Sequence, residues 1–181
     1  QGPVYDKTKK RGVGFSIHPA WHAEWQEVRR GHIPISITLN PDGTVILNAP
    51  TVETGTGSNT CNVLGCAESL SFLGVTPEKI HWNHLVNTDT SLKDCVQTDS
   101  SVSYLQSEVI ATAVDEIRQE ILDRAEPVFK AKSADMDIVD GRVFLKKNPD
   151  QGMTVKEVLF QGDLVPITIT KSKSTVFVKS I

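Results

Sequence analysis

The sequence has few cysteines, and their spacing excludes the usual structural roles. Three of them, Cys61, Cys66 and Cys95, occur among 181 residues. An odd number without short paired spacing makes neither a disulfide framework nor a tetrahedral zinc site. Cys61 and Cys66 match half of a plant-type iron–sulfur spacing, but Ser69 stands where the third cysteine would be. We predict buried, reduced thiols rather than metal ligands, and these favour a cytoplasmic location.

The sequence also lacks a basic surface and a long hydrophobic run. It carries 19 Lys and Arg against 22 Asp and Glu, a formal net charge of −3. This balance, without a stripe of Lys or Arg, argues against nucleic acid as a partner. No apolar run approaches the roughly 20 residues that cross a bilayer, so we expect no membrane span.

The length fits one domain, or two small subdomains with a shared core. We expect residues 1–10 to form a polar arm and residues 11–181 to form the folded unit. The chain begins at Gln1 and ends within a strand-like segment. We therefore expect a processed subunit or a piece of a longer polypeptide.

Alternating apolar residues predict several strands. Residues 33–39 alternate strictly, an Asn-Pro-Asp-Gly turn follows, and residues 44–47 return, which predicts a hairpin. Residues 12–17 also alternate, with glycines where another backbone can approach. A further strand is predicted over residues 80–86. His81 and His84 would point to opposite faces of that strand, which argues against a shared ligand.

Helical spacing predicts two main helices. Apolar residues recur at this spacing from Val63 to Leu73, and Gly74 ends that helix. A longer i, i+4 stripe over residues 105–125 predicts an amphipathic helix of about six turns, ended by Pro127.

The remaining segments complete the expected fold. Residues 18–30 are compatible with a short helix and with an inserted loop; His18 and His22 there lack the carboxylate of a metalloprotease motif. In the tail we predict a hairpin over residues 136–145, a short helix over residues 154–160 and a strand over residues 164–170. The order indicates an α+β class, an α/β sandwich whose mixed sheet with hairpins carries two main helices on one face.

Two small-residue turns are the most informative feature for function. The sequences ETGTGSNT at residues 53–60 and QTDSS at residues 97–101 each follow an extended run and precede a helical pattern. The first amides of a helix lack internal partners and lie at the positive end of its dipole. We therefore predict a polar or phosphate-bearing cofactor held at two points.

Motifs for other chemistries are absent. The G-x-G-x-x-T sequence at residues 55–60 lacks the third glycine of a dinucleotide site and its acidic partner. No Gly-Lys-Ser/Thr loop and no nucleophile elbow occur. We therefore assign no catalytic residue and no metal ligand, and predict a cofactor-binding or interaction domain.

Six motifs in order and spacing resemble the molybdenum-cofactor-binding region of the xanthine dehydrogenase / aldehyde oxidase family, the molybdenum hydroxylases. They span roughly residues 10–130. They are RGVG at 11–14, DGTV at 42–45, ETGTG at 53–57, AE with LG over 67–74, TDT at 88–90, and TDSS at 98–101 before the long helix.

The resemblance implies an oxidoreductase that hydroxylates an aldehyde or an N-heteroaromatic substrate with oxygen from water. It implies a molybdopterin cofactor, including the cytosine dinucleotide form, with iron–sulfur clusters and FAD on partner subunits or domains. Carried over by position, the cofactor-binding residues are Gly55, Thr56, Gly57, Ser100 and Ser101.

The sequence departs from this family in three places. Thr56 stands where the family has a Gln near the metal, no glutamate motif of the catalytic base follows Gln151, and the other cofactor-binding half is absent. We therefore expect a chain that is not catalytically complete on its own. The alternatives are a structural or assembly module of the same fold, and a nucleotide-binding module unrelated to molybdenum.

Overall fold

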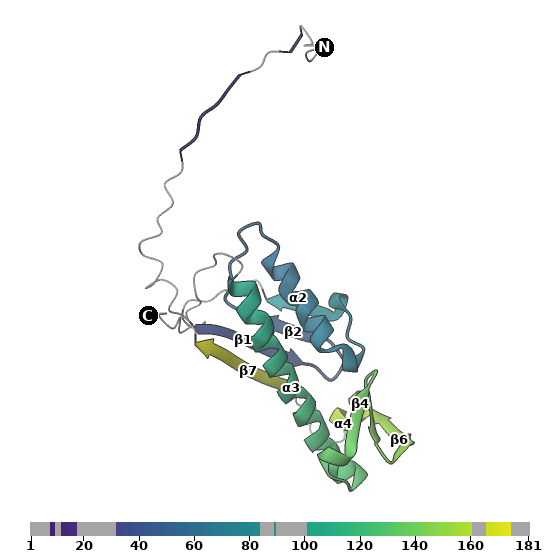
Figure 1. Cartoon of the computed structure of the whole chain (residues 1–181). Coiled ribbons are helices and arrows are strands. Elements are labelled where there is room, and N and C mark those ends of the chain that lie inside the picture. The colour runs from purple at the N-terminus through teal and green to yellow at the C-terminus, as the bar shows by residue number, and fades with distance from the viewer. Residues whose placement is uncertain are drawn as a thin grey trace, which may run out of the picture.

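The computed structural model describes residues 8–9, 12–17, 32–83, 89, 101–160 and 166–174. Its larger sheet has the strand order β3-β2-β1-β7 (Figure 1). The strands are β1 (His32–Leu39), β2 (Val45–Asn48), β3 (Ile80–Asn83) and β7 (Ile167–Ser174). β1 is antiparallel to β2 and β7, whereas β2 is parallel to β3. The predicted mixed sheet is confirmed.

The central hairpin forms as the sequence predicts. Every second residue of β1 is buried beneath the helices: Ile33, Ile35, Ile37 and Leu39. In the turn, the Gly43 N–H donates to the Asn40 carbonyl at 2.9 Å. The Asp42 carboxylate accepts from the Thr44 N–H at 2.9 Å and from the Thr44 hydroxyl at 2.6 Å. These bonds to Thr44 hold the pKa of Asp42 below its ordinary value.

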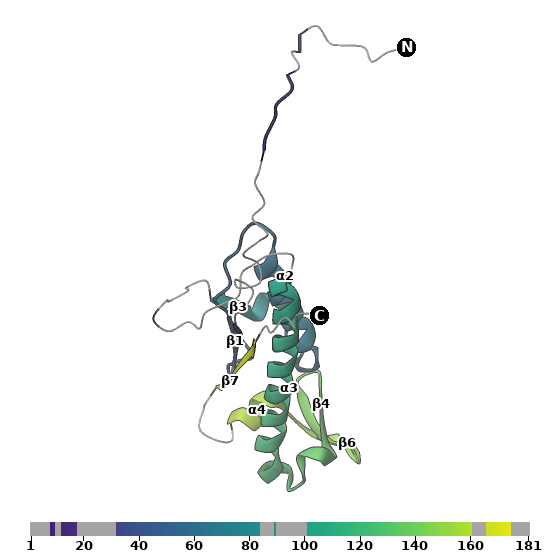
Figure 2. The same cartoon turned by 60° about the vertical axis from the view of Figure 1, so that its left-hand side comes forward.

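Two helices cover one face of the larger sheet, as predicted (Figure 2). Helix α2 (Ser58–Ser69) connects β2 to the parallel strand β3, and the short 3-10 turn η1 (Ser71–Leu73) follows it. Gly74 ends this segment in the left-handed conformation, as predicted. Helix α3 (Ser101–Phe129) is the longest element. No helix in the described part of the chain is long and apolar enough to span a membrane.

Helix α3 buries the predicted stripe but ends later than predicted. The buried residues on this stripe are Val109, Ala113, Ile117, Ile121 and Ala125. Pro127 lies inside the helix, which continues to Phe129. The proline ring removes one donor close to the helix end, and Phe129 packs against the core beyond it. The helix ends before Lys130, whose φ is +51°.

A smaller antiparallel sheet, of order β4-β5-β6, packs near the C-terminal half of α3 (Figure 1). Its strands are β4 (Met136–Val139), β5 (Arg142–Leu145) and β6 (Asn148–Thr154), and α4 (Val155–Phe160) follows. The predicted hairpin and short helix are confirmed. Strand β6 was not predicted, because its residues are mostly exposed and polar and show no apolar alternation. The predicted strand of the tail is β7, and residues 161–165 lie outside the described part.

The predicted strand over residues 12–17 is wrong. These residues are extended but unpaired, and they stand clear of the sheets (Figures 1 and 2). Val13 is 98% exposed and Phe15 is 95% exposed. Alternation makes a strand only beside another strand, and none of the described strands lies next to this segment. The predictions for residues 18–30, 84–86, Cys95 and the turn at 97–100 fall outside the described residues.

Gly141 joins the smaller sheet to the 3-10 turn η1 and to α4. Its N–H donates to the Phe72 carbonyl at 2.9 Å, and its carbonyl accepts from the Val155 N–H at 2.8 Å. The φ of Gly141 is +71°, and a Cβ placed on it would lie 2.9 Å from the Leu73 carbonyl oxygen. Only glycine suits both conditions.

We predict that Gly141→Ala destabilises the protein more than Gly43→Ala. Both glycines have positive φ, but a Cβ on Gly43 meets nothing within 4 Å. The left-handed conformation costs each variant about 1 kcal/mol, and the contact with Leu73 adds a similar amount only for Gly141. Denaturant unfolding of both variants measures the difference. Equal losses in the free energy of unfolding would show that the contact between Gly141 and Leu73 tolerates the added methyl group.

Candidate functional site

The Glu53 carboxylate is the centre of the first small-residue turn. Its Oε1 accepts from the N–H of Gly55 at 2.8 Å and of Gly57 at 3.0 Å. Its Oε2 accepts from the Asn59 N–H at 3.1 Å and from the Ser58 hydroxyl at 3.1 Å. The Thr56 hydroxyl lies 3.4 Å from Oε1. Three backbone amides and two hydroxyls therefore converge on one side chain.

Left-handed glycines make this arrangement possible. Gly55 has φ +91° and Gly57 has φ +76°. These values turn the N–H groups of both glycines toward the same point, a geometry that binds anions. Gly57 is the N-cap of α2 and has no side chain to cap the helix. Glu53 supplies the missing acceptor from four residues earlier.

The charge of Glu53 is strongly stabilised in this position. The Asn59 N–H, followed by the Gly57 N–H, the Ser58 hydroxyl and the Gly55 N–H, lowers the pKa of Glu53 to about 2. These donors outweigh partial desolvation, which acts in the opposite direction. Glu53 is therefore ionised at neutral pH and lies at the positive end of α2.

A buried polar triad holds the N-terminal turns of α2 and α3 together. Gln106, which is fully buried in α3, donates from Nε2 to the Thr51 hydroxyl and accepts at Oε1 from Asn62 Nδ2. Thr51 follows β2, and Asn62 lies in the second turn of α2. Buried amides need such partners. Both helices consequently begin at the same end of the molecule (Figure 1).

One buried polar atom at this end is unpaired within the described part of the chain. Asn59 Oδ1 accepts no hydrogen bond from the described residues. An unpaired buried acceptor costs free energy.

The structure places most, but not all, of the predicted site residues. Gly55, Thr56 and Gly57 form one turn, and each of them donates to Glu53. Ser101 begins α3, and Ser100 lies outside the described residues. The two predicted turns therefore precede helices whose first turns lie together.

Sequence reasoning missed Glu53 and the triad. A sequence signal for the triad exists: Val102, Gln106, Ile110 and Val114 form a second i, i+4 stripe, and all four are buried. A single glutamine within an apolar stripe indicates a buried polar contact. Glu53 has a weaker signal, since a carboxylate that caps a helix normally lies at the N-cap itself.

The cysteine prediction holds for one of the two described residues. Cys66 is buried, and burial raises the pKa of its thiol to about 12. Cys61 is exposed, so the prediction of a buried thiol there is wrong. It lies on the outward side of α2, five residues before Cys66. No three His, Cys, Asp or Glu side chains gather as metal ligands within the described ranges.

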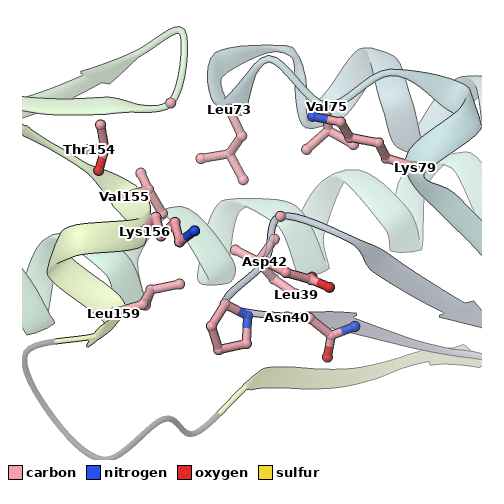
Figure 3. A pocket seen from close by; sticks show the side chains of 13 residues that line it. Leu39, Asn40, Asp42, Leu73, Val75, Lys79, Thr154, Val155, Lys156 and Leu159 are labelled. Carbon is pink, nitrogen blue, oxygen red and sulfur yellow. The ribbon is translucent and has the colours of Figure 1, made fainter.

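A hollow lies at the other end of α2. It has a volume of about 150 Å³ and lies between the β1–β2 turn, the segment around Val75 and the start of α4. Figure 3 shows Lys156 reaching toward Asp42 across it. Its walls are otherwise largely apolar, and it is remote from Glu53.

Comparison with known proteins identifies the family. A family model described as "Molybdopterin cofactor-binding domain" matches residues 3–177. The chain belongs to this family.

Similar solved structures agree with this assignment in fold. They include a Cu,Mo-CO dehydrogenase, with a TM-score of 0.64 and 20% identity over 79% of this chain. Quinoline 2-oxidoreductase from Pseudomonas putida 86 gives a TM-score of 0.61 and 21% identity over 80% of this chain. A reconstituted CO dehydrogenase from Oligotropha carboxidovorans gives 0.63 and 20% over 78%. This chain spans only 18%, 19% and 18% of those chains, respectively.

The site fits an anionic cofactor in one respect, because two helix N-termini lie together. The amides of Gly55 and Gly57, however, are already bonded to Glu53. The turn therefore presents its outer surface, rather than these two amides, to a ligand.

We predict that Glu53 stabilises the fold in a pH-dependent manner. Because its pKa falls from 4.5 to about 2 on folding, its contribution is complete above pH 4.5 and is lost as the pH falls from there through 2. Denaturant unfolding of the wild type and of Glu53→Gln measures this. The difference between them should be constant above this window and shrink within it. A difference independent of pH down to 2 would contradict the hydrogen bonding described above.

We predict that Gln106→Met destabilises the protein by about 1–3 kcal/mol, because Asn62 and Thr51 lose their buried partner. The control is Gln119→Met on the same helix. Gln119 is exposed, and its side chain donates to Asp123 at 2.7 Å. The free energy of unfolding of this variant should therefore stay within about 0.5 kcal/mol of the wild type. Equal effects in thermal or denaturant unfolding would show that the triad is dispensable.

Proposed function

We propose that this chain supplies part of the molybdopterin site of a molybdenum hydroxylase like those of the xanthine dehydrogenase / aldehyde oxidase family. The bound cofactor would supply hydroxylation of an aldehyde or N-heteroaromatic carbon with oxygen from water. The observation that carries the proposal is the pairing of the α2 and α3 N-termini in a chain of the molybdopterin cofactor-binding family.

The chain's own contribution is to bind and orient. Two positive helix ends attract an anionic group, and the Gln106 triad fixes their spacing. The turn of Gly55, Thr56 and Gly57 borders the cofactor on one side, and Ser100 and Ser101 border it on the other. We assign no catalytic base to this chain, so a partner must supply it.

We propose that the rest of the enzyme lies on other polypeptides or on other domains. The chain spans about a fifth of its structural neighbours, so a complete site needs a second cofactor-binding half. We propose residues 1–10 as an arm and residues 11–181 as the partial domain. We also propose partner iron–sulfur and FAD units, the cytosine dinucleotide form of the cofactor and a cytoplasmic location.

A second candidate is a structural or assembly module of the same fold. The Thr56 hydroxyl turns back to within 3.4 Å of the Glu53 carboxylate. It is shorter than the glutamine that the family carries at this position. A module that had lost the metal contact would show this change.

The test is analysis of molybdenum and pterin in the native complex isolated through this chain. We expect both to co-elute with this chain and a larger partner. Ser101→Ala should weaken cofactor retention about tenfold, because it removes one hydrogen bond to a charged group. The loss of such a bond costs about 1.4 kcal/mol, which corresponds to a factor of ten in affinity.

The matched control is Ser107→Ala. Ser107 is exposed on the same helix, and its hydroxyl bonds to the Tyr104 carbonyl at 2.7 Å. This variant should retain the cofactor fully. A complex with partners but without molybdenum or pterin would refute the proposal and support the structural module.

A further inference from the structure

We propose that Glu53 is a positioning residue for the cofactor: its carboxylate shapes the turn over residues 55–59 from within and stays there when the cofactor binds. This inference rests on the proposed function, because it concerns the same site. It assigns the amides of Gly55 and Gly57 to the protein itself, not to the ligand.

The contacts of Glu53 use both of its oxygens. Oε1 accepts the two glycine amides and lies near the Thr56 hydroxyl, whereas Oε2 accepts from Ser58 and Asn59. The donors come from five consecutive residues, so their conformations depend on one acceptor. Removing the carboxylate leaves two left-handed glycines and the first turn of α2 without a common partner.

A competing explanation is that Glu53 only holds the place of a cofactor anion and is displaced by it. The hydrogen bonding argues against this. The Glu53 carboxylate accepts from three backbone amides and from the Ser58 hydroxyl at once, through both of its oxygens. A displacing anion would have to break these four hydrogen bonds, at a cost in free energy.

The two explanations predict effects of opposite sign. If Glu53 positions the turn, its removal disorders the cofactor-facing surface and weakens binding, since preorganisation is lost. If Glu53 is a placeholder, its removal frees three amides and eliminates a competing negative charge, so binding strengthens. Measurement of cofactor retention therefore decides between them.

The experiment compares Glu53→Gln with Glu68→Gln in the native complex. A glutamine at position 53 still offers one acceptor oxygen, but its NH₂ group cannot accept from Ser58 or Asn59. Glu68 is an exposed residue on α2, so its variant makes the same charge change away from the turn. Molybdenum and pterin are measured after prolonged dialysis. Hydrogen exchange of the Gly55, Gly57 and Asn59 amides is measured on the cofactor-free complex.

We expect Glu53→Gln to lose the cofactor about tenfold faster than the wild type. We also expect hydrogen exchange at its Asn59 amide to be about tenfold faster than in the wild type. Glu68→Gln should match the wild type in both. Retention equal to or tighter than the wild type in Glu53→Gln would overturn this inference alone. A wild-type complex without molybdenum or pterin would refute the proposed function, and with it this inference.

Ser58→Ala keeps the test decisive if Glu53→Gln does not fold. This variant removes one donor to Oε2 and retains the carboxylate with its other partners. We expect a smaller change of the same sign in cofactor retention, together with faster exchange at Asn59. Wild-type values for both measurements would overturn the inference.

Discussion

The N-terminus of α2 depends on a single carboxylate that lies outside the helix. Its N-cap is a glycine without a side chain, so the first helical amides need an acceptor from elsewhere. Glu53 supplies it, and two left-handed glycines direct their amides to the same point. The conformation of the turn, the direction in which α2 starts and the surface offered to a ligand all follow from this interaction.

The second constraint is the alignment of α2 with α3. Gln106 bonds to both Thr51 and Asn62 and is fully buried, so the two helices cannot slide past each other without leaving polar atoms unpaired. Helix α3 then continues to the smaller sheet, where Phe129 packs on the same core. One long helix thus runs from the candidate site to the smaller sheet.

Much of the fold was predictable from local patterns. The central hairpin follows from strict alternation around a Pro-Asp-Gly turn, and α3 follows from its apolar stripe. Strand β6 was not predictable, since its exposed polar residues pair with β5 without burying a face. The extension of α3 past Pro127 depends on tertiary packing of Phe129, which no local pattern reveals.

The turns of the candidate site were predictable from the sequence, but their hydrogen bonding was not. Small residues before two helices, and their resemblance to one family, predicted a molybdopterin-binding domain, and the family match confirms that domain. The position of the cofactor on these turns stays a prediction. The sequence did not reveal that the amides of Gly55 and Gly57 bond to Glu53. Which acceptor a backbone amide uses depends on the path of the turn, and residue types alone do not specify it.

The most direct test of this account is an experimental structure of the native complex with its cofactor. The account predicts molybdopterin against the first turns of α2 and α3, with the Glu53 carboxylate still bonded to the amides of Gly55, Gly57 and Asn59. A cofactor bound away from these turns, or a Glu53 side chain displaced by a cofactor anion, would contradict it.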